Sequence, residues 1–202
     1  MSGMHGALSI VELISARLWR DIHDLVESLD GALSAPGPEF GPGAQDTART
    51  LLIRLKLRQA AWRPADGPVP LTDVKALARG LPERVGIDAS PLDPDSVFAP
   101  ETGRIVLNLL LLAAESLPSG GIIMLAGSVD DLFVRLAGPA AAWPAGLALC
   151  LSDASAAQSA LTEPPGMQSA LTALLAQEAG LRLSMVIPPV SRTEPPMLRL
   201  GG

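Results

Sequence analysis

The sequence predicts an α+β protein in two parts, a helical hairpin followed by a small α/β sandwich with helices on one face of a mixed sheet. Residues 8–33 and 44–62 carry apolar side chains at helical spacing, which predicts two long helices. After residue 70, short strand-like runs and helical runs are separated by Gly and Pro, which predicts the sandwich. The chain has 202 residues and is 48% hydrophobic but only 3% aromatic, so Ala and Leu must fill the core, which favours helices.

The first predicted helix, residues 8–33, has one apolar stripe and one polar side. At about 100° per residue, six apolar residues fall on a single narrow face: Val11, Ile14, Leu18, Ile22, Leu25 and Leu29. The remaining surface carries a group of ionisable and charged residues: Arg20, Asp21, His23, Asp24 and Glu27. We expect the stripe to pack against other helices and the polar side to carry the function.

The second predicted helix, residues 44–62, follows a segment at 34–43 that is rich in Pro and Gly and ends the first helix. This second helix is strongly basic: it contains Arg49, Arg54, Lys56 and Arg58, with Arg63 directly after it. Two long amphipathic helices joined by a short loop predict an antiparallel hairpin. One hairpin leaves its apolar stripe half exposed, so we expect a homodimer in which two hairpins form a four-helix bundle.

The segment at residues 63–70, RPADGPVP, predicts a domain boundary because it concentrates Pro and Gly. We therefore expect a helical dimerisation domain over residues 1–66 and an α/β domain over 67–202. The elements predicted in the second domain are, in order, a helix capped by Thr72 and ended by Gly80, a strand over 84–89, a loop over 90–101, a helix over 103–117, a hairpin of strands 122–127 and 131–138, a partly helical segment over 140–163, a helix over 167–179, a strand over 181–187 and a final edge strand over 196–200.

The net charge and the hydropathy of the chain argue against two classes of partner, nucleic acids and membranes. The net charge of −6 argues against nucleic acid as a partner. The longest apolar run, residues 105–114, contains Asn108 and is too short to cross a bilayer, and no targeting segment is evident. The single Cys150 lies in an apolar run, where we expect a small buried hydrophobe rather than a nucleophile. Together these features predict a cytoplasmic protein without a membrane or nucleic-acid partner.

Four stretches, taken together, resemble a known family. Residues 103–123, GRIVLNLLLLAAESLPSGGII, look like the asparagine-box segment of histidine kinases and are closer still to that of ChpT-type histidine phosphotransferases. Residues 54–62 resemble the second bundle helix of that family, residues 166–185 its last helix and strand, and SARLWRD at 15–21 its first-helix motif. The resemblance implies a dimer with a central helical bundle and a degenerate kinase-like ATPase domain, which passes phosphoryl groups between receiver domains of response regulators in a two-component phosphorelay.

Apart from Asn108, the residues that kinases use for ATP are not found in this sequence. Kinases usually place a second asparagine four residues after the position matched by Asn108, and here that position is Leu112, which cannot bind a metal. The sequence contains no Asp-x-Gly-x-Gly pattern and no Gly-rich lid, and Gly120-Gly121 is explained more simply as a helix-to-strand turn. We expect Asn108 to be a polar residue satisfied at a helix surface, and we expect no ATP chemistry, cofactor or metal.

One departure from the family motif bears directly on phosphotransfer. The motif has a histidine where this chain has Arg20, followed by the acidic position matched by Asp21. A protonated guanidinium is a poor nucleophile and cannot accept a phosphoryl group. His23, followed by Asp24, stands three residues further along the same polar side and offers a neutral imidazole.

Three interpretations stay open at this point. The protein binds receiver domains without transfer, with Arg20 paired to the acidic pocket of the receiver; or it transfers phosphoryl groups through His23; or it is a scaffold with no receiver partner. His5 lies before the first helix and is expected to have no role.

Overall fold

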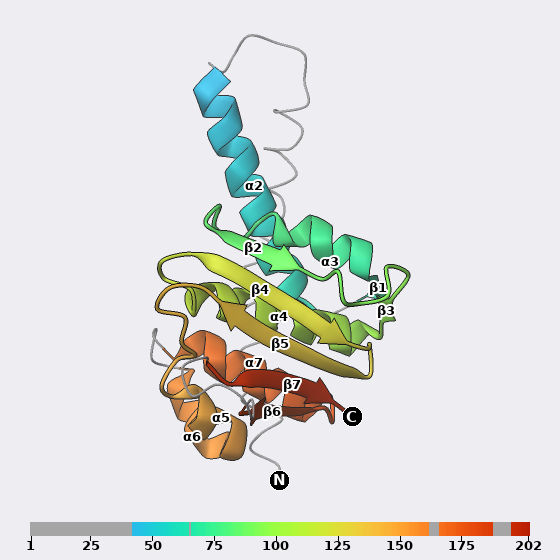
Figure 1. The fold of residues 1–202 in the computed structure, drawn as a ribbon, viewed down its shortest axis with the longest axis vertical. Coiled ribbons are helices and arrows are strands. Elements are labelled where there is room, and N and C mark those ends of the chain that lie inside the picture. The colour runs from blue at the N-terminus through green and yellow to red at the C-terminus, as the bar shows by residue number, and fades with distance from the viewer. Residues whose placement is uncertain (1–41, 65, 162–165, 188–194) are drawn as a thin grey trace.

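A five-stranded mixed sheet with helices on one face forms the body of the protein (Figure 1). The structure is a computed structural model, and it describes residues 42–64, 66–161, 166–187 and 195–202. Its helices are α2 (Pro42–Trp62), α3 (Leu71–Ala78), α4 (Pro100–Glu115), α5 (Leu147–Ser152), α6 (Ala154–Ala160) and α7 (Met167–Glu178). Its strands are β1 (Val69–Pro70), β2 (Val85–Asp88), β3 (Val97–Phe98), β4 (Gly121–Gly127), β5 (Asp131–Ala137), β6 (Arg182–Val186) and β7 (Met197–Gly201). The predicted α+β class is therefore confirmed.

The main sheet has the strand order β2-β4-β5-β7-β6, and β2 and β4 form its single parallel pair. A parallel pair needs a crossover between its strands, and α4 supplies it, as in other βαβ units. β4 and β5 pair as an antiparallel hairpin in which Leu125 lies opposite Val134. The short strands β1 and β3 form a separate two-stranded sheet at the start of this region.

Alternation along each strand divides the sheet into a buried face and an exposed face. Side chains on the inner face are fully or almost fully buried: Ile123, Leu125, Leu132, Val134, Leu136, Leu198 and Leu200. In Figure 1 this inner face meets α4 and α7, which lie behind the strands. The outer face mixes exposed and half-buried residues, among them Ile122, Met124, Phe133 and Arg199.

Helix α4 lies at the centre of the core. Every residue from 105 to 114 is buried, because α2, α3, α7 and the sheet together cover the helix on all sides. At about 1.5–3 kcal/mol for each large apolar side chain removed from water, this helix dominates the hydrophobic stabilisation of the fold. A helix with an amphipathic pattern would have one side exposed to solvent. Helix α4 is instead almost continuously Leu, Val and Ala, which explains why it can be enclosed on all sides.

Helix α2 is held to this core by its second half alone. Leu57 and Ala61 are fully buried, and Arg104 on α4 donates a 2.8 Å hydrogen bond to the carbonyl oxygen of Trp62. The first half of α2 projects beyond the sheet (Figure 1). Near the middle of the helix, Leu51 is 50% exposed and Ile53 is 38% exposed, so two large apolar side chains of α2 are open to solvent.

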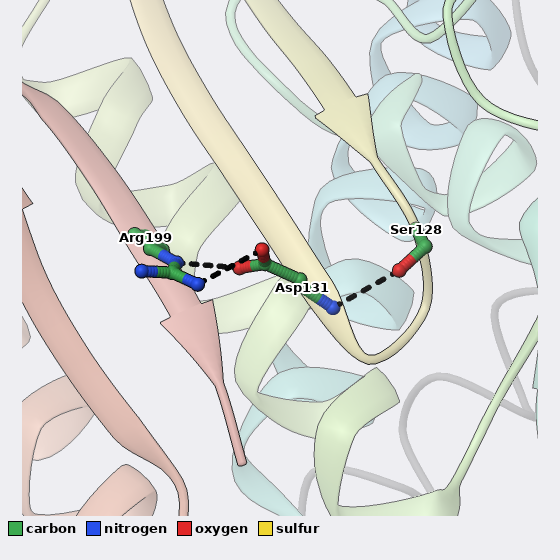
Figure 2. Close-up of polar contacts among 3 residues, drawn as sticks. All are labelled: Ser128, Asp131 and Arg199. Atoms are coloured by element: carbon green, nitrogen blue, oxygen red, sulfur yellow. Dashed lines mark hydrogen bonds and ion pairs between the residues drawn. The ribbon is translucent and has the colours of Figure 1, made fainter.

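A polar contact joins β5 to β7 on the outer face (Figure 2). Asp131 accepts hydrogen bonds from Arg199 Nε at 2.6 Å and from its terminal nitrogen at 3.0 Å, and the Arg199 guanidinium lies 5.6 Å from the centre of the Phe133 ring. The Asp131 N–H donates to Ser128 Oγ, which closes the turn between β4 and β5. The hydrogen bonds from Arg199 hold the pKa of the Asp131 carboxyl below its usual range. The stabilisation from this pair is thus present above the unfolded-state pKa and is lost as the pH falls through the folded-state value.

Most of the predicted elements are confirmed. The helix over 44–62 corresponds to α2, the strand over 84–89 to β2, and the hairpin to β4 and β5. The helix over 167–179 and the strand over 181–187 correspond to α7 and β6, and the partly helical segment contains α5 and α6. The first predicted helix, the hairpin that it forms with α2, and the four-helix bundle lie outside the described residues. Among the described residues, no helix combines the length and apolarity needed to span a membrane.

Two of the predicted details were wrong. Thr72 does not cap α3, because the helix begins at Leu71 and the Leu71 N–H donates to the carbonyl oxygen of Ser96 in the β3 segment. A neighbouring loop thus provides the acceptor that a side-chain cap would have supplied. Similarly, the loop over 90–101 contains β3, and α4 begins at Pro100 rather than at Gly103, since proline is well suited to the first turn of a helix.

The last strand was also placed wrongly. β7 was expected at an edge of the sheet, but it pairs with β5 on one side and β6 on the other. Its inner side chains, Leu198 and Leu200, are buried for this reason. Trp143 donates a 2.6 Å hydrogen bond from Nε1 to the carbonyl oxygen of Pro196, which ties the segment after β5 to the start of β7.

Gly80 allows α2 to approach the segment after α3, so its replacement should destabilise the protein. A Cβ at this position would lie 2.7 Å from the Ile53 carbonyl oxygen and 3.0 Å from Leu57 Cβ. We expect Gly80→Ala to cost about 1–3 kcal/mol, measured by urea unfolding, because the helix backbone must move. Gly67→Ala is the matched control: no atom lies within 4 Å of the added Cβ there. Equal unfolding free energies for the two variants would contradict this account of the packing.

Candidate functional site

The residues predicted to carry the function belong to the first predicted helix, residues 8–33. Arg20, Asp21, His23 and Asp24 all lie outside the described residues, so their roles stay predictions. The described structure does show the second helix of the predicted hairpin and the helices to which it is attached. The described part of the candidate site consists of α2 and the helices that contact it, among them α4 with Asn108.

Helix α2 presents a basic surface. Arg49, Lys56, Arg58 and Arg63 are exposed along and just beyond the helix, while Asp46 is its single acidic residue. Arg63 forms an exposed 3.0 Å ion pair with Asp66 directly after the helix.

The positive charge of Arg58 on α2 also acts on Glu115, the last residue of α4. Partial desolvation raises the pKa of the Glu115 carboxyl, and the charge of Arg58 acts in the opposite direction. α2 thus offers cations to a partner from a surface that adjoins the packed core.

Asn108 on α4 links three helices through its side-chain amide. Its Nδ2 group donates to the carbonyl oxygen of Ala61 on α2 and, at 2.9 Å, to that of Arg104 on α4 itself. Its Oδ1 accepts a 3.1 Å hydrogen bond from Gln168 Nε2 on α7. Gln168 Nε2 also lies 3.2 Å from Thr172 Oγ1, and that hydroxyl donates to the Gln168 carbonyl oxygen at 2.7 Å. The amide therefore has both of its hydrogens and its oxygen engaged within the protein.

This arrangement corrects one expectation about Asn108. It is satisfied, as predicted, but it is 0% exposed and lies between α2, α4 and α7 rather than at a helix surface. A surface position was expected because one polar residue in an apolar helix usually faces water. Here α2 and α7 cover that side of α4 and bring the acceptors and the donor that a buried amide needs.

The neighbouring positions also have structural roles. Leu112 is fully buried one turn further along α4. Gly120 and Gly121 form the turn from α4 into β4 with φ values of +84° and +151°, which L side chains rarely adopt. A Cβ at Gly120 would lie 2.6 Å from the Arg84 carbonyl oxygen. The interpretation of this pair as a helix-to-strand turn is confirmed.

Cys150 is buried on α5, and burial raises the pKa of its thiol. Its expected character as a small buried hydrophobe is confirmed, since a thiol with a raised pKa is a weak nucleophile at neutral pH. Within the described ranges, no group of three or more His, Cys, Asp or Glu side chains is placed to hold a metal ion.

Comparison with known proteins places this architecture in a family. The family model of the histidine phosphotransferase C-terminal domain matches residues 71–189, more than half of the chain. The chain belongs to the histidine phosphotransferase family. The matched range begins at the first residue of α3 and includes the whole of α4, so Asn108 and its partner Gln168 both fall within the histidine phosphotransferase domain.

A solved structure, described as a 1.7 Angstrom structure of a bacterial phosphotransferase, shares the fold of this histidine phosphotransferase. The alignment has a TM-score of 0.56 and 20% sequence identity, and it covers 99% of this chain and 96% of that chain. At this identity the likeness concerns the fold alone. No curated protein matches the chain.

Sequence reasoning found Asn108 but missed its partners. Gln168 and Thr172 lie on a helix that was predicted, yet neither was singled out. Their signal was present in the sequence: two polar residues four apart on one side of an otherwise Ala- and Leu-rich helix predict a buried polar contact. The partner of that contact was not evident, because Asn108 and Gln168 are 60 residues apart.

Asn108→Ala should destabilise the fold through unpaired polar groups. The variant leaves the Ala61 carbonyl oxygen without this donor and Gln168 Nε2 without this acceptor in a buried site. We expect a loss of about 2–3 kcal/mol of unfolding free energy in urea. Gln158→Ala on α6 is the control and should change stability by less than about 0.5 kcal/mol. An Asn108→Ala variant as stable as the parent would show that the three-helix contact adds no stability.

Proposed function

We propose that this histidine phosphotransferase is of the ChpT type, a homodimer that engages receiver domains of response regulators in a two-component phosphorelay without using ATP. The observation that carries the proposal is the engagement of Asn108, the kinase asparagine position, in a buried contact between α2, α4 and α7. In this proposal residues 1–66 form the dimerisation and docking part and residues 67–202 form a degenerate kinase-like part.

The absence of ATP chemistry follows from the chemistry of Mg²⁺. Magnesium prefers oxygen ligands in octahedral geometry and bridges the nucleotide phosphates in kinases. The Asn108 amide is fully buried and occupied by protein partners. Leu112, at the position of the second asparagine, has no ligating atom. Neither residue supports a bound nucleotide.

The dimer is supported by the apolar surface of α2. Leu51 and Ile53 are exposed near the middle of the helix, and burying each would contribute about 1.5–3 kcal/mol. The apolar stripe predicted for residues 8–33 adds to this surface. A second copy would cover both helices as a four-helix bundle, with an expected burial of about 2,000 Å² or more for an obligate interface.

Light scattering of the parent at micromolar concentration should therefore give the mass of a dimer. Leu51→Glu should raise the dissociation constant at least tenfold, because it places a charge in the apolar interface. Val97→Glu is the matched control, since Val97 is also 50% exposed but lies on β3, away from α2. Circular dichroism separates dissociation from unfolding. A monomeric parent would contradict the dimer.

The receiver-binding surface includes the position of Arg20. Receiver domains present an acidic pocket around their phospho-aspartate, and a guanidinium pairs with such carboxylates and with phosphoryl oxygens. The exposed cations of α2, Arg49 and Arg58 among them, add to this attraction. Because arginine cannot accept the phosphoryl group, the primary proposal is receiver binding without transfer at position 20.

A second candidate function is transfer through His23, favoured by the local string His23-Asp24-Leu25. A neutral ring nitrogen of His23 would attack phosphorus, forming an N–P bond while the P–O bond to the receiver aspartate breaks and its carboxylate leaves. Asp24 would accept a hydrogen bond from the other ring nitrogen, and Arg20 would neutralise phosphoryl charge. His5 is the only other histidine in the chain and lies before the predicted helix.

The deciding experiment follows radiolabelled phosphate from a phosphorylated receiver onto this protein. The parent, His23→Ala and Arg20→His are compared, and acid lability identifies a label on histidine. Under the primary proposal the parent binds the receiver but takes no label, and Arg20→His gains it. Label on the parent that disappears in His23→Ala would establish the second candidate instead.

Two outcomes would contradict both versions. Label that persists in His23→Ala would place the phosphoryl group on another residue, and failure of the parent to bind any receiver would favour a scaffold role. Labelled ATP with Mg²⁺ is the parallel arm: it should label none of the three proteins. Labelling from ATP would refute the proposed loss of nucleotide chemistry.

A further inference from the structure

A cavity of about 560 Å³ lies between α5, α6 and the start of α7, and neither Asn108 nor any residue of α2 lines it. Small residues create the space, since half of its ten lining residues are Ala or Gly: Ala145, Gly146, Ala156, Ala160 and Gly166. Leu149, Cys150 and Ser169 complete much of the wall. The volume falls in the range of small-molecule sites, about 300–1,000 Å³. Residues 162–165, which connect α6 to α7, lie outside the described residues.

The residues that line the cavity favour an uncharged occupant. None of its ten lining residues is ionised at neutral pH, and the raised pKa of Cys150 keeps that thiol protonated. A charged molecule would lose hydration on entry without meeting an opposite charge, which is costly. A neutral molecule with mainly apolar surface fits the wall.

Ser169 supplies one polar feature of the site. It is 2% exposed, and its hydroxyl has no hydrogen-bond partner within the described part of the chain. On the neighbouring helices, the Ser152 and Ser159 hydroxyls each donate to a carbonyl oxygen four residues earlier. An unsatisfied buried hydroxyl costs about 1–3 kcal/mol, so such a group in a cavity wall calls for a partner.

We propose that this cavity binds a small, neutral, mainly apolar molecule whose hydroxyl or carbonyl oxygen accepts a hydrogen bond from Ser169. The Ser169 hydroxyl oxygen is itself enclosed in this structure, so the proposal requires rotation about the single χ1 bond to turn the hydroxyl toward the occupant. The apolar part of the molecule contacts Leu149 and the Ala and Gly residues of the wall. The proposal does not depend on the proposed function.

Helix α7 connects this cavity to the rest of the protein. Ser169 lines the cavity, while Gln168, the preceding residue, donates to Asn108 Oδ1. Asn108 in turn donates to the carbonyl oxygen of Ala61 on α2. A molecule that binds Ser169 therefore stabilises the helix that completes the Asn108 contact, and binding should raise the melting temperature of the whole protein.

The probe for the test is 6-propionyl-2-dimethylaminonaphthalene, a neutral fluorescent ketone with one carbonyl acceptor. We expect saturable binding to the parent, with blue-shifted emission. Ser169→Ala should weaken binding about five- to tenfold, which corresponds to one hydrogen bond. Ala156→Phe should abolish binding by filling the cavity. Ala148→Phe is the matched control, because Ala148 is exposed on α5 and does not line the cavity.

Cys150 provides an independent readout, because it is the only cysteine of the chain and lines the same cavity. The rate at which methyl methanethiosulfonate modifies the thiol should fall when the ketone is at saturation. Circular dichroism verifies that each variant is folded. Absence of saturable binding to the parent, equal binding by the two Phe variants, or a Cys150 rate unchanged by the ketone would each overturn the proposal and leave a cavity that holds only water.

Discussion

The hydrogen bonds of one buried amide, that of Asn108, determine how α2, α4 and α7 meet. The side chain is fully enclosed, and each of its polar atoms has a partner on one of the three helices. A buried amide tolerates few alternative arrangements, because any shift that breaks a bond leaves a group without water to replace it. Apolar packing around α4 supplies most of the stabilisation, and Asn108 makes that packing specific to one relative placement of the helices.

This contact also fixes the direction in which α2 leaves the core. Asn108 and Arg104 both donate to carbonyl oxygens at the end of α2, and Gly80 lets the helix backbone approach closely. The first half of the helix then projects, and Leu51 and Ile53 near its middle are exposed. The sequence predicted that the segment around Asn108 resembles the asparagine-box segment of histidine kinases, where it would serve the nucleotide. In this histidine phosphotransferase the side chain instead orients the helix proposed to carry the dimer.

Sequence patterns predicted the helices and strands of the described part well, because local hydrophobic periodicity determines them. α2, α7, β2 and the β4–β5 hairpin each follow from spacing and turn residues within a few positions of the chain. The predictions that were wrong depend on contacts between residues far apart in the sequence. Thr72 was expected as a cap, but Ser96 supplies the acceptor for Leu71 from a loop distant in sequence. The place of β7 between β5 and β6 depends on strand pairing, which local patterns do not encode.

For the candidate site, too, the sequence predicted local properties and the structure was needed for contacts between distant residues. The sequence alone supplied the chemical inventory: Arg20 in the stretch predicted to match the family's histidine motif, His23 and Asp24 close to it, Leu112 four residues after Asn108, and a single Cys150. Only the tertiary structure decided that Asn108 is buried and engaged, and that Gln168, 60 residues away, is its partner. It also assembled the cavity beside Ser169 from three helices. The physical reason is that side-chain chemistry is a property of single residues, whereas burial and hydrogen-bond satisfaction depend on which distant segments the fold brings together.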